Sequence, residues 1–291
     1  MPSFLITGCS SGIGLEMARQ LAARGEKVFA TCRAKGSSKT GVDLLSQLSG
    51  DITVLEGIDV ASDEVGAKLT AALGGVKLGA RKRSPPPSAP LIPFRVSGSF
   101  RASEHPAVAR SLPRSSPSDV VVHNAGSAHG TEGPALDKIF DEQKLDTITM
   151  DRMRAAFEVN TLGPLRVQQA VLPLMTEGGK VAVISTGIGS IGDNGSGGRY
   201  AYRTSKAGAN MVTRSMAMDL KSKGIAVQAV APGFVQTEFG PGIEMMTKYG
   251  AAPVDRAVTT IISVLDAMTL ENTGEFIMVP TDGSDPKPFP W

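Results

Sequence analysis

The chain has 291 residues, of which 41% are hydrophobic and 20% charged, and its formal net charge is +2 at pH 7. These values are typical of a globular protein with a packed core and exclude the charged, apolar-poor composition of a disordered chain. The near-neutral charge argues against nucleic acid or a membrane surface as a partner. Two cysteines, Cys9 and Cys32, do not suffice for a disulfide framework. Because no secretory or transit signal and no run of about 18 apolar residues is visible, we expect a cytoplasmic protein.

The first thirty residues predict a strand, a helix and a second strand, at 4–6, 15–23 and 27–32. The turn before the helix, residues 7–14, reads Thr-Gly-Cys-Ser-Ser-Gly-Ile-Gly. Its glycines permit a tight turn, a close approach of the backbone to a pyrophosphate, and close packing of the helix on the strand. The turn is therefore a predicted phosphate-binding site, formed by Gly8, Ser10, Ser11, Gly12, Ile13 and Gly14.

The end of the second strand indicates which dinucleotide binds. An acidic residue there hydrogen-bonds the ribose of NAD and repels the additional phosphate of NADP. In this sequence Cys32 takes that position, and Arg33, a charge-assisted donor for phosphate, follows it. The pattern favours NADP(H) over NAD(H). The alternative is that Arg33 is an ordinary solvated charge.

Strand-like apolar runs recur along the rest of the chain and are separated by helical patterns. The runs lie at 52–55, 120–122, 181–184 and 225–230, and long helical patterns cover 150–175 and 201–221. Strands that lack in-and-out alternation and are spaced by helices predict a parallel sheet with helices on both faces. We therefore expect an α/β, Rossmann-type, doubly wound fold in a single domain, residues 1–291.

Residues 79–118 interrupt this pattern. The segment holds eight prolines, nine serines, seven lysines or arginines and one acid, Glu104, so its net charge of +6 exceeds the +2 of the whole chain. Such a composition predicts an irregular, solvated insertion. A basic docking segment and a product of faulty splicing are the alternatives.

A tyrosine and a lysine stand at the start of the helical pattern 201–221. Tyr202 and Lys206 are four residues apart and therefore share one helix face. A nearby ammonium group lowers the pKa of a phenol, which lets the phenol exchange a proton with a carbonyl or alcohol oxygen. Tyr200 is assigned to packing, because Thr204 rather than a lysine lies four residues after it. The pair alone is common on amphipathic helices, so its meaning depends on the other motifs.

Further motifs accompany this pair in a fixed order. They are Asn124-Ala125-Gly126 after a strand, Asn160 in a long helix, hydroxyl residues after 183–184, and Pro-Gly-Phe-Val-Gln-Thr at 232–237. With these motifs and the glycine turn, the chain outside the insertion resembles the short-chain dehydrogenases/reductases. Within them it is most similar to the carbonyl-reductase-like group of the C-factor and Sniffer proteins.

The resemblance implies an NADP(H)-dependent oxidoreductase that reduces a carbonyl or oxidises the matching alcohol. In such an enzyme Tyr202 exchanges the proton, Lys206 binds the nicotinamide ribose and lowers the tyrosine pKa, and Asn160 orients a water of the proton relay. The implied cofactor contacts include Asp59, Asn124, Ala125, Gly126, Pro232, Gly233, Val235 and Thr237. The resemblance implies a small-molecule substrate, a homodimer or homotetramer, and no metal. A cofactor-binding regulator or scaffold without chemistry is the alternative.

The sequence leaves open which hydroxyl orients the substrate oxygen. Thr186 is favoured by the Gly-x-x-Gly that follows it, while Ser190 and then Ser185 are the other candidates. His123 is interpreted as a structural residue.

Residues 238–252 are predicted to cover the substrate. They hold Phe239, Met245, Met246 and Tyr249 among several glycines, a pattern that is typical of a lid over an apolar substrate.

Overall fold

The computed structural model describes residues 3–33, 41–74, 119–128, 144–239 and 242–291. The expected insertion 79–118 and residues 240–241 of the expected lid lie outside these described residues.

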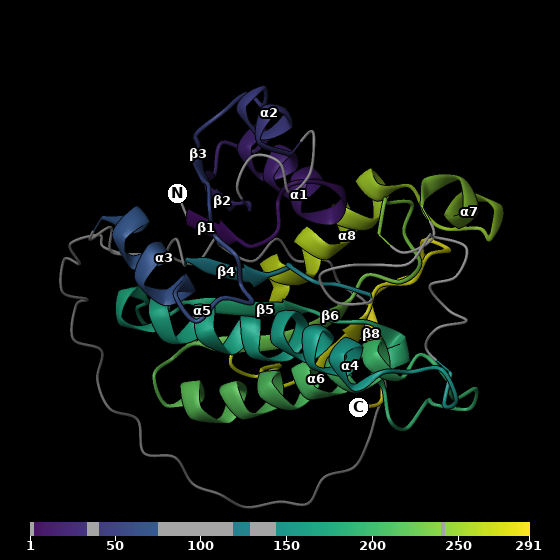
Figure 1. Ribbon diagram of the computed structural model, residues 1–291. Coiled ribbons are helices and arrows are strands. Elements are labelled where there is room, and N and C mark those ends of the chain that lie inside the picture. Colours follow the sequence, from purple (N-terminus) through teal and green to yellow (C-terminus); the bar gives the residue numbers. More distant parts are fainter. Residues whose placement is uncertain (1–2, 34–40, 75–118, 129–143, 240–241) are drawn as a thin grey trace, which may run out of the picture.

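One eight-stranded sheet forms the centre of the fold, with the order β3-β2-β1-β4-β5-β6-β7-β8 (Figure 1). Its strands are β1 Ser3–Ile6, β2 Lys27–Thr31, β3 Ile52–Leu55, β4 Val120–His123, β5 Lys180–Ile184, β6 Ala226–Ala231, β7 Phe276–Met278 and β8 Lys287–Pro288. Strands β1 to β7 pair in parallel, which confirms the predicted doubly wound sheet. The antiparallel edge strand β8 was not anticipated. The strand order reverses between β1 and β4, where ligands bind in folds of this kind.

Helices cover both faces of the sheet (Figure 1). They are α1 Gly12–Ala23, α2 Gly41–Ser46, α3 Val65–Leu73, α4 Met150–Phe157, α5 Gly163–Val171, α6 Tyr200–Lys221, α7 Ile243–Lys248 and α8 Val254–Ala267. Helix α1 packs against α8, α3 against α5, and α4 against α6. Successive strand residues point to opposite faces. Accordingly, Phe4 and Ile6 of β1 join the core under α1 and α8, and Leu5 joins the core under α3 and α5. No helix among the described residues is long and apolar enough to cross a membrane.

The predicted helical pattern at 150–175 is confirmed, but the helix is not α-helical throughout. A π-helical turn, Glu158–Leu162, separates α4 from α5, and a 3-10 turn, Leu172–Leu174, follows α5. Pro164 has no backbone N–H to donate to the carbonyl of Asn160, four residues before it. Turns of the π type occur frequently at functional sites. The buried Asn160 lies in the middle of this one.

Candidate active site

A cavity of about 430 Å³ lies where the loops that follow β1 to β6 meet the start of α6. The predicted site residues that line it are Gly8, Ser10, Ser11, Gly12, Ile13, Arg33, Asp59, Asn124, Ala125, Gly126, Thr186, Tyr202, Lys206, Pro232, Gly233, Val235 and Thr237. Residues far apart in the sequence therefore meet in one place. Of the predicted set, Gly14, Asn160 and Ser190 do not line the cavity, and each has another role in the structure.

The glycine turn after β1 has the geometry of an anion site. Gly8 has φ +71°, and a Cβ atom on it would lie 2.7 Å from Ala125 Cα. Gly12 has φ +56°, and a Cβ there would lie 3.3 Å from Thr237 Cγ2. Ser11, the N-cap of α1, makes no side-chain capping bond, and the first turn of α1 holds no acid. The first N–H groups of α1 thus retain their capacity to bind a phosphate group.

Asn124 joins the loop after β4 to the glycine turn. Its Nδ2 donates to the carbonyls of Thr7 and Gly8, both at 3.0 Å, and the N–H groups of Asn124 and Ala125 donate to Thr7 Oγ1. A Cβ on Gly14 would lie 2.5 Å from the Gly8 carbonyl oxygen and would also meet the Asn124 amide. Gly14 therefore acts by leaving room for this junction. It does not reach the cavity.

Residues that follow β2 and β3 form a further wall of the cavity. Cys32 is buried there and Arg33 is exposed. Asp59 lines the cavity, and its Oδ1 also accepts from the Ala61 N–H at 3.0 Å. Asp59 can therefore close this turn and still face the cavity. Cys9 and Cys32 are free and buried, and burial raises the pKa of both thiols.

Tyr202 and Lys206 reach the cavity from the first turns of α6. Thr186, just after β5, forms a hydrogen bond with Tyr202. Burial raises the pKa of Tyr202 to about 12, and the Thr186 hydrogen bond and the Arg199 charge act in the opposite direction. Burial lowers the pKa of Lys206 to about 8, and its Nζ donates to the Ile184 carbonyl at 2.8 Å. The Arg199 charge thus lowers the phenol pKa, and Lys206 Nζ holds the end of β5, while the expected effect of Lys206 on the phenol stays a prediction.

No sequence pattern indicated a role for Arg199. It precedes α6 with φ 52° and ψ 40°, and it is the one non-glycine residue with positive φ in the described part of the chain. Such a conformation costs on the order of 1–3 kcal/mol and persists where the surrounding structure requires it. Arg199 lies three residues before Tyr202, close enough for its charge to act on the phenol.

Asn160 has a positioning role in the structure. Its Oδ1 accepts from the Ser127 N–H at 2.8 Å, and its Nδ2 donates to the Ser127 carbonyl at 2.7 Å and to Ser205 Oγ at 2.9 Å. The side chain thereby fastens the loop after β4 to α6. The expected water-orienting function of Asn160 stays a prediction, and these bonds give the side chain a positioning role beside it. A Cβ on Gly126 would lie 3.4 Å from both Asn160 Oδ1 and Lys206 Nζ.

Among the three candidate hydroxyls, the geometry favours Thr186. Ser190 is buried, donates to the Trp291 carbonyl at 3.2 Å and accepts from the Asp193 N–H at 3.0 Å. Ser185 lines the cavity, but its hydroxyl donates to Asn210 Oδ1 at 2.5 Å. The prediction that Ser190 could orient the substrate oxygen is therefore corrected, because its hydroxyl is bonded to Trp291 in the C-terminal segment and does not line the cavity.

The predicted lid contributes two of its four named side chains to the cavity. Phe239 and Met246 line it, and the Phe239 ring lies 5.8 Å from the Tyr202 ring. Met245 and Tyr249 are exposed and are not part of the lining. The ends of the segment are joined, because Ala252 donates to the Phe234 carbonyl at 2.8 Å and Gln236 to the Ala252 carbonyl at 2.9 Å.

The comparisons with known proteins agree with this geometry. A family model described as short chain dehydrogenase matches residues 3–76 and 95–247. The chain belongs to the short-chain dehydrogenase family. It is 33% identical over 278 residues to 1-hydroxy-2-glutathionyl-2-methyl-3-butene dehydrogenase of Rhodococcus sp. (strain AD45), covering 95% of this chain and 96% of that protein. It is 38% identical over 126 residues to the C-signal protein of Myxococcus xanthus, covering 43% of this chain and 72% of that one.

Solved structures of similar proteins share the fold. The NADPH-bound carbonyl reductase from chicken fatty liver superimposes with a TM-score of 0.69 at 23% identity, covering 100% of this chain and 99% of that one. The carbonyl reductase Sniffer of D. melanogaster gives a TM-score of 0.68 at 23% identity, with 100% of each chain covered. The family predicted from the sequence motifs is confirmed by the family model and the relative from Rhodococcus, and the predicted fold by these structures.

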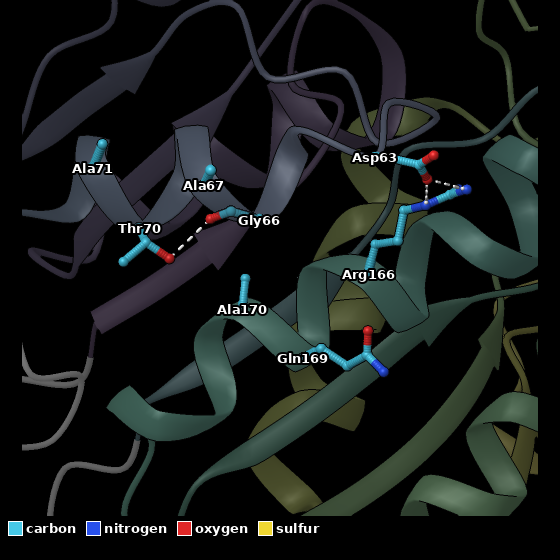
Figure 2. Close-up of a pocket in the computed structure, with 8 residues that line it drawn as sticks. All are labelled: Asp63, Gly66, Ala67, Thr70, Ala71, Arg166, Gln169 and Ala170. Atoms are coloured by element: carbon cyan, nitrogen blue, oxygen red, sulfur yellow. Dashed lines mark hydrogen bonds and ion pairs between the residues drawn. The ribbon is translucent and has the colours of Figure 1, made fainter.

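A second hollow of this short-chain dehydrogenase, about 650 Å³, lies between α3 and α5. Figure 2 shows its lining, which consists mainly of small side chains together with the ion pair of Asp63 and Arg166 at 2.8 Å. The Thr70 hydroxyl donates a hydrogen bond to the Gly66 carbonyl at 2.8 Å. The titratable groups of this lining, Asp63 and Arg166, are paired with each other, so we place the chemistry in the first cavity. Among the described residues no group of three or more His, Cys, Asp or Glu side chains could hold a metal.

His123 behind the cavity should make this short-chain dehydrogenase sensitive to acid. The side chain is buried beside Gln168, and burial lowers its pKa from 6.5 to about 4. Between these pH values the unfolded chain binds a proton that the folded chain does not, so the free energy of unfolding falls as the pH falls. We expect a loss of about 3 kcal/mol from this residue, complete near pH 4. Urea unfolding across this pH range should show a smaller loss in His123→Asn, and an equal loss in both proteins would contradict the assignment.

Proposed function

We propose that this short-chain dehydrogenase uses NADP(H) to reduce a carbonyl, or to oxidise the matching secondary alcohol, with Tyr202 as the general acid or base. The observation that carries the proposal is that Tyr202, Thr186 and Lys206 line the same cavity as the glycine turn. An anion-binding turn and a proton donor in one cavity suit a reaction in which a dinucleotide and a carbonyl compound meet.

The residues of the cavity fit NADP(H). Gly8 and Gly12, with positive φ, and the uncapped start of α1 would hold the pyrophosphate. Arg33 would pair with the additional phosphate, since the position after β2 carries Cys32 and no acid. The adenosine would contact Asp59, Asn124, Ala125 and Gly126, and the nicotinamide end Lys206, Pro232, Gly233, Val235 and Thr237. NADPH in the carbonyl reductase from chicken fatty liver supports this choice.

The residues around Tyr202 would move the proton. Bound NADPH supplies the hydride for the carbonyl carbon. With a pKa of about 12, the Tyr202 phenol is protonated at neutral pH, the form that reduction requires. The Tyr202 and Thr186 hydroxyls orient the carbonyl oxygen, and the phenol donates its proton as negative charge develops there. Arg199 and Lys206 then stabilise the phenolate that remains.

Side chains of the segment 238–252 would select the substrate. Replacing Phe239 or Met246 by alanine should change the ratio of kcat/KM between large and small carbonyl compounds by about 10-fold, because each removes apolar side-chain area from the cavity that holds Tyr202. NADPH affinity should not change. The matched controls are Met245→Ala and Tyr249→Ala, which remove exposed side chains of the same segment. Equal loss of cofactor affinity and substrate preference would contradict this role.

The proposal is tested by titrating the purified protein with NADPH and with NADH, followed by turnover on a panel of aldehydes and ketones. Carbonyl compounds related to glutathione conjugates belong in the panel, because the relative from Rhodococcus is named for such a substrate. We expect tighter binding of NADPH and oxidation of NADPH that Tyr202→Phe abolishes. Binding without turnover that depends on Tyr202 would favour a cofactor-binding regulator, and tighter binding of NADH would refute the choice of cofactor.

A further inference from the structure

The segment after β8 returns to the sheet and is fixed there by aromatic rings. The Phe289 N–H donates to the Phe276 carbonyl at 2.8 Å, which continues the pairing of β8 with β7. The buried Phe276 ring stacks on Trp291, with centroids 5.3 Å apart, and meets the Phe289 ring edge-on at 5.6 Å. Aromatic pairs of this kind contribute beyond the apolar area that they bury.

Trp291 contacts the loop that begins with Thr186. Its carbonyl oxygen accepts from the Gly192 N–H at 2.9 Å and from Ser190 Oγ at 3.2 Å. A Cβ on Gly192 would lie 3.4 Å from this oxygen, so the two chain segments are in close contact. This contact explains why Ser190 is buried without reaching the cavity.

A 3-10 turn, Gly187–Gly189, connects this contact to Thr186. Gly189 N–H donates to the Thr186 carbonyl and Ser190 N–H to the Gly187 carbonyl, both at 3.0 Å. The turn is tightly packed against the C-terminal strands, because a Cβ on Gly187 would lie 2.7 Å from Met278 Cε and 3.7 Å from the Phe289 ring. A shift of Ser190 would therefore be transmitted through the turn to Thr186.

Helix α6 holds the same turn from the other side. Arg203 Nη1 donates to the Ile188 carbonyl at 3.0 Å, and Asn210 Nδ2 donates to the Gly189 carbonyl at 3.4 Å. Because α6 also carries Tyr202, the turn lies between the helix that bears the phenol and the C-terminal segment.

We propose that Trp291, with Ser190 as its partner, is a positioning residue that fixes the Thr186 hydroxyl against Tyr202. The inference rests on the proposed function, because it concerns the placement of a hydroxyl of that reaction. Neither Trp291 nor Ser190 lines the cavity, so both act through the turn. A displacement of about 1 Å at a reacting group can lower the rate by about 10²-fold.

The kinetic test compares Trp291→Ala, Trp291→Phe, Ser190→Ala and the double variant with alanine at both positions. We expect kcat to fall by roughly 10- to 100-fold in Trp291→Ala with NADPH affinity unchanged. Trp291→Phe should recover most of kcat, since it retains the ring on Phe276. The double variant should be no slower than Trp291→Ala, because the ring on Phe276 holds the main-chain oxygen that Ser190 binds, so both changes loosen the same contact.

Two further measurements separate positioning from a general effect on folding. The pH profile of alcohol oxidation should move to higher pH in Trp291→Ala, because the Thr186 hydrogen bond lowers the Tyr202 pKa. Hydrogen exchange of residues 187–192 should become faster in Trp291→Ala, whereas exchange in the glycine turn 8–14 should not change. Exchange requires no turnover, so it decides the inference even if the proposed reaction fails for the parent protein.

Three results would overturn the inference. The first is unchanged exchange over residues 187–192 in Trp291→Ala. The second is a loss of kcat that Trp291→Phe does not recover. The third is a loss in Ser190→Ala that adds in full to that of Trp291→Ala, since this would make Ser190 an independent catalytic group.

Discussion

Tyr202→Phe should lower kcat for carbonyl reduction by about 10²–10⁴-fold, the range for loss of a positioned general acid. The substitution removes the phenol oxygen and retains the ring that packs against Phe239. Because the glycine turn is untouched, NADPH should bind with unchanged affinity. Steady-state oxidation of NADPH and a fluorescence titration with NADPH measure the two quantities. Equal activity of both proteins would remove Tyr202 from the mechanism.

Variants of the neighbouring hydroxyls provide the control. Thr186→Val keeps the side-chain shape and removes the group that hydrogen-bonds Tyr202, so kcat should fall by about 10²–10³-fold. Ser185→Ala removes a hydroxyl that is bonded to Asn210 and should have a smaller effect. A larger loss in Ser185→Ala than in Thr186→Val would reverse their roles.

Gly14→Ala should disrupt the cofactor site although Gly14 does not line it. The added methyl group would lie 2.5 Å from the Gly8 carbonyl oxygen, and backbone cannot yield as a flexible side chain can. Overpacking of this kind costs about 1–3 kcal/mol. If the displaced turn bears the strain, NADPH affinity should fall by roughly 5- to 150-fold, which corresponds to that energy. Calorimetric titration with NADPH and urea unfolding measure the two effects.

Gly66→Ala in α3 is the matched control. A Cβ on Gly66 would meet only Ala170 Cβ, at 3.6 Å, which is an ordinary contact (Figure 2 shows both residues). Alanine is favoured over glycine in a helix by about 1 kcal/mol, so this variant should be slightly more stable and bind NADPH normally. A similar loss of affinity in both variants would show that the effect of Gly14→Ala is not specific to the glycine turn.

Local patterns were sufficient to predict most of the architecture. Buried parallel strands consist of continuous apolar runs, and β3 Ile52–Leu55 was predicted with the bounds that the structure has. The π-helical turn at Asn160 was missed, because apolar spacing does not report a single extra residue in a helical turn. The strands β7 and β8 were also missed, since they are three and two residues long.

The residues of the cavity that belong to a sequence motif were predicted individually. Residues whose role depends on tertiary contacts were predicted less well. The glycine turn and the Tyr202-Lys206 pair are visible as spacings, whereas the choice between Thr186 and Ser190 depends on the direction of each side chain. Trp291 lies about one hundred residues from Ser190, and no spacing links them. Arg199 was missed because its effect on Tyr202 depends on one backbone conformation.

The bridge between Val235 and Ala252 allows the segment between these two residues to vary in length. It fixes both ends of the intervening segment beside the end of β6, so a replacement segment of different length would start and finish at the same points. Lengthening a loop whose ends are held costs little closure entropy, about 0.6 kcal/mol for each doubling. On the role proposed above for this segment, substrate range would change by exchange of this one segment, while the sheet, the glycine turn and the Tyr202 helix keep their sequence.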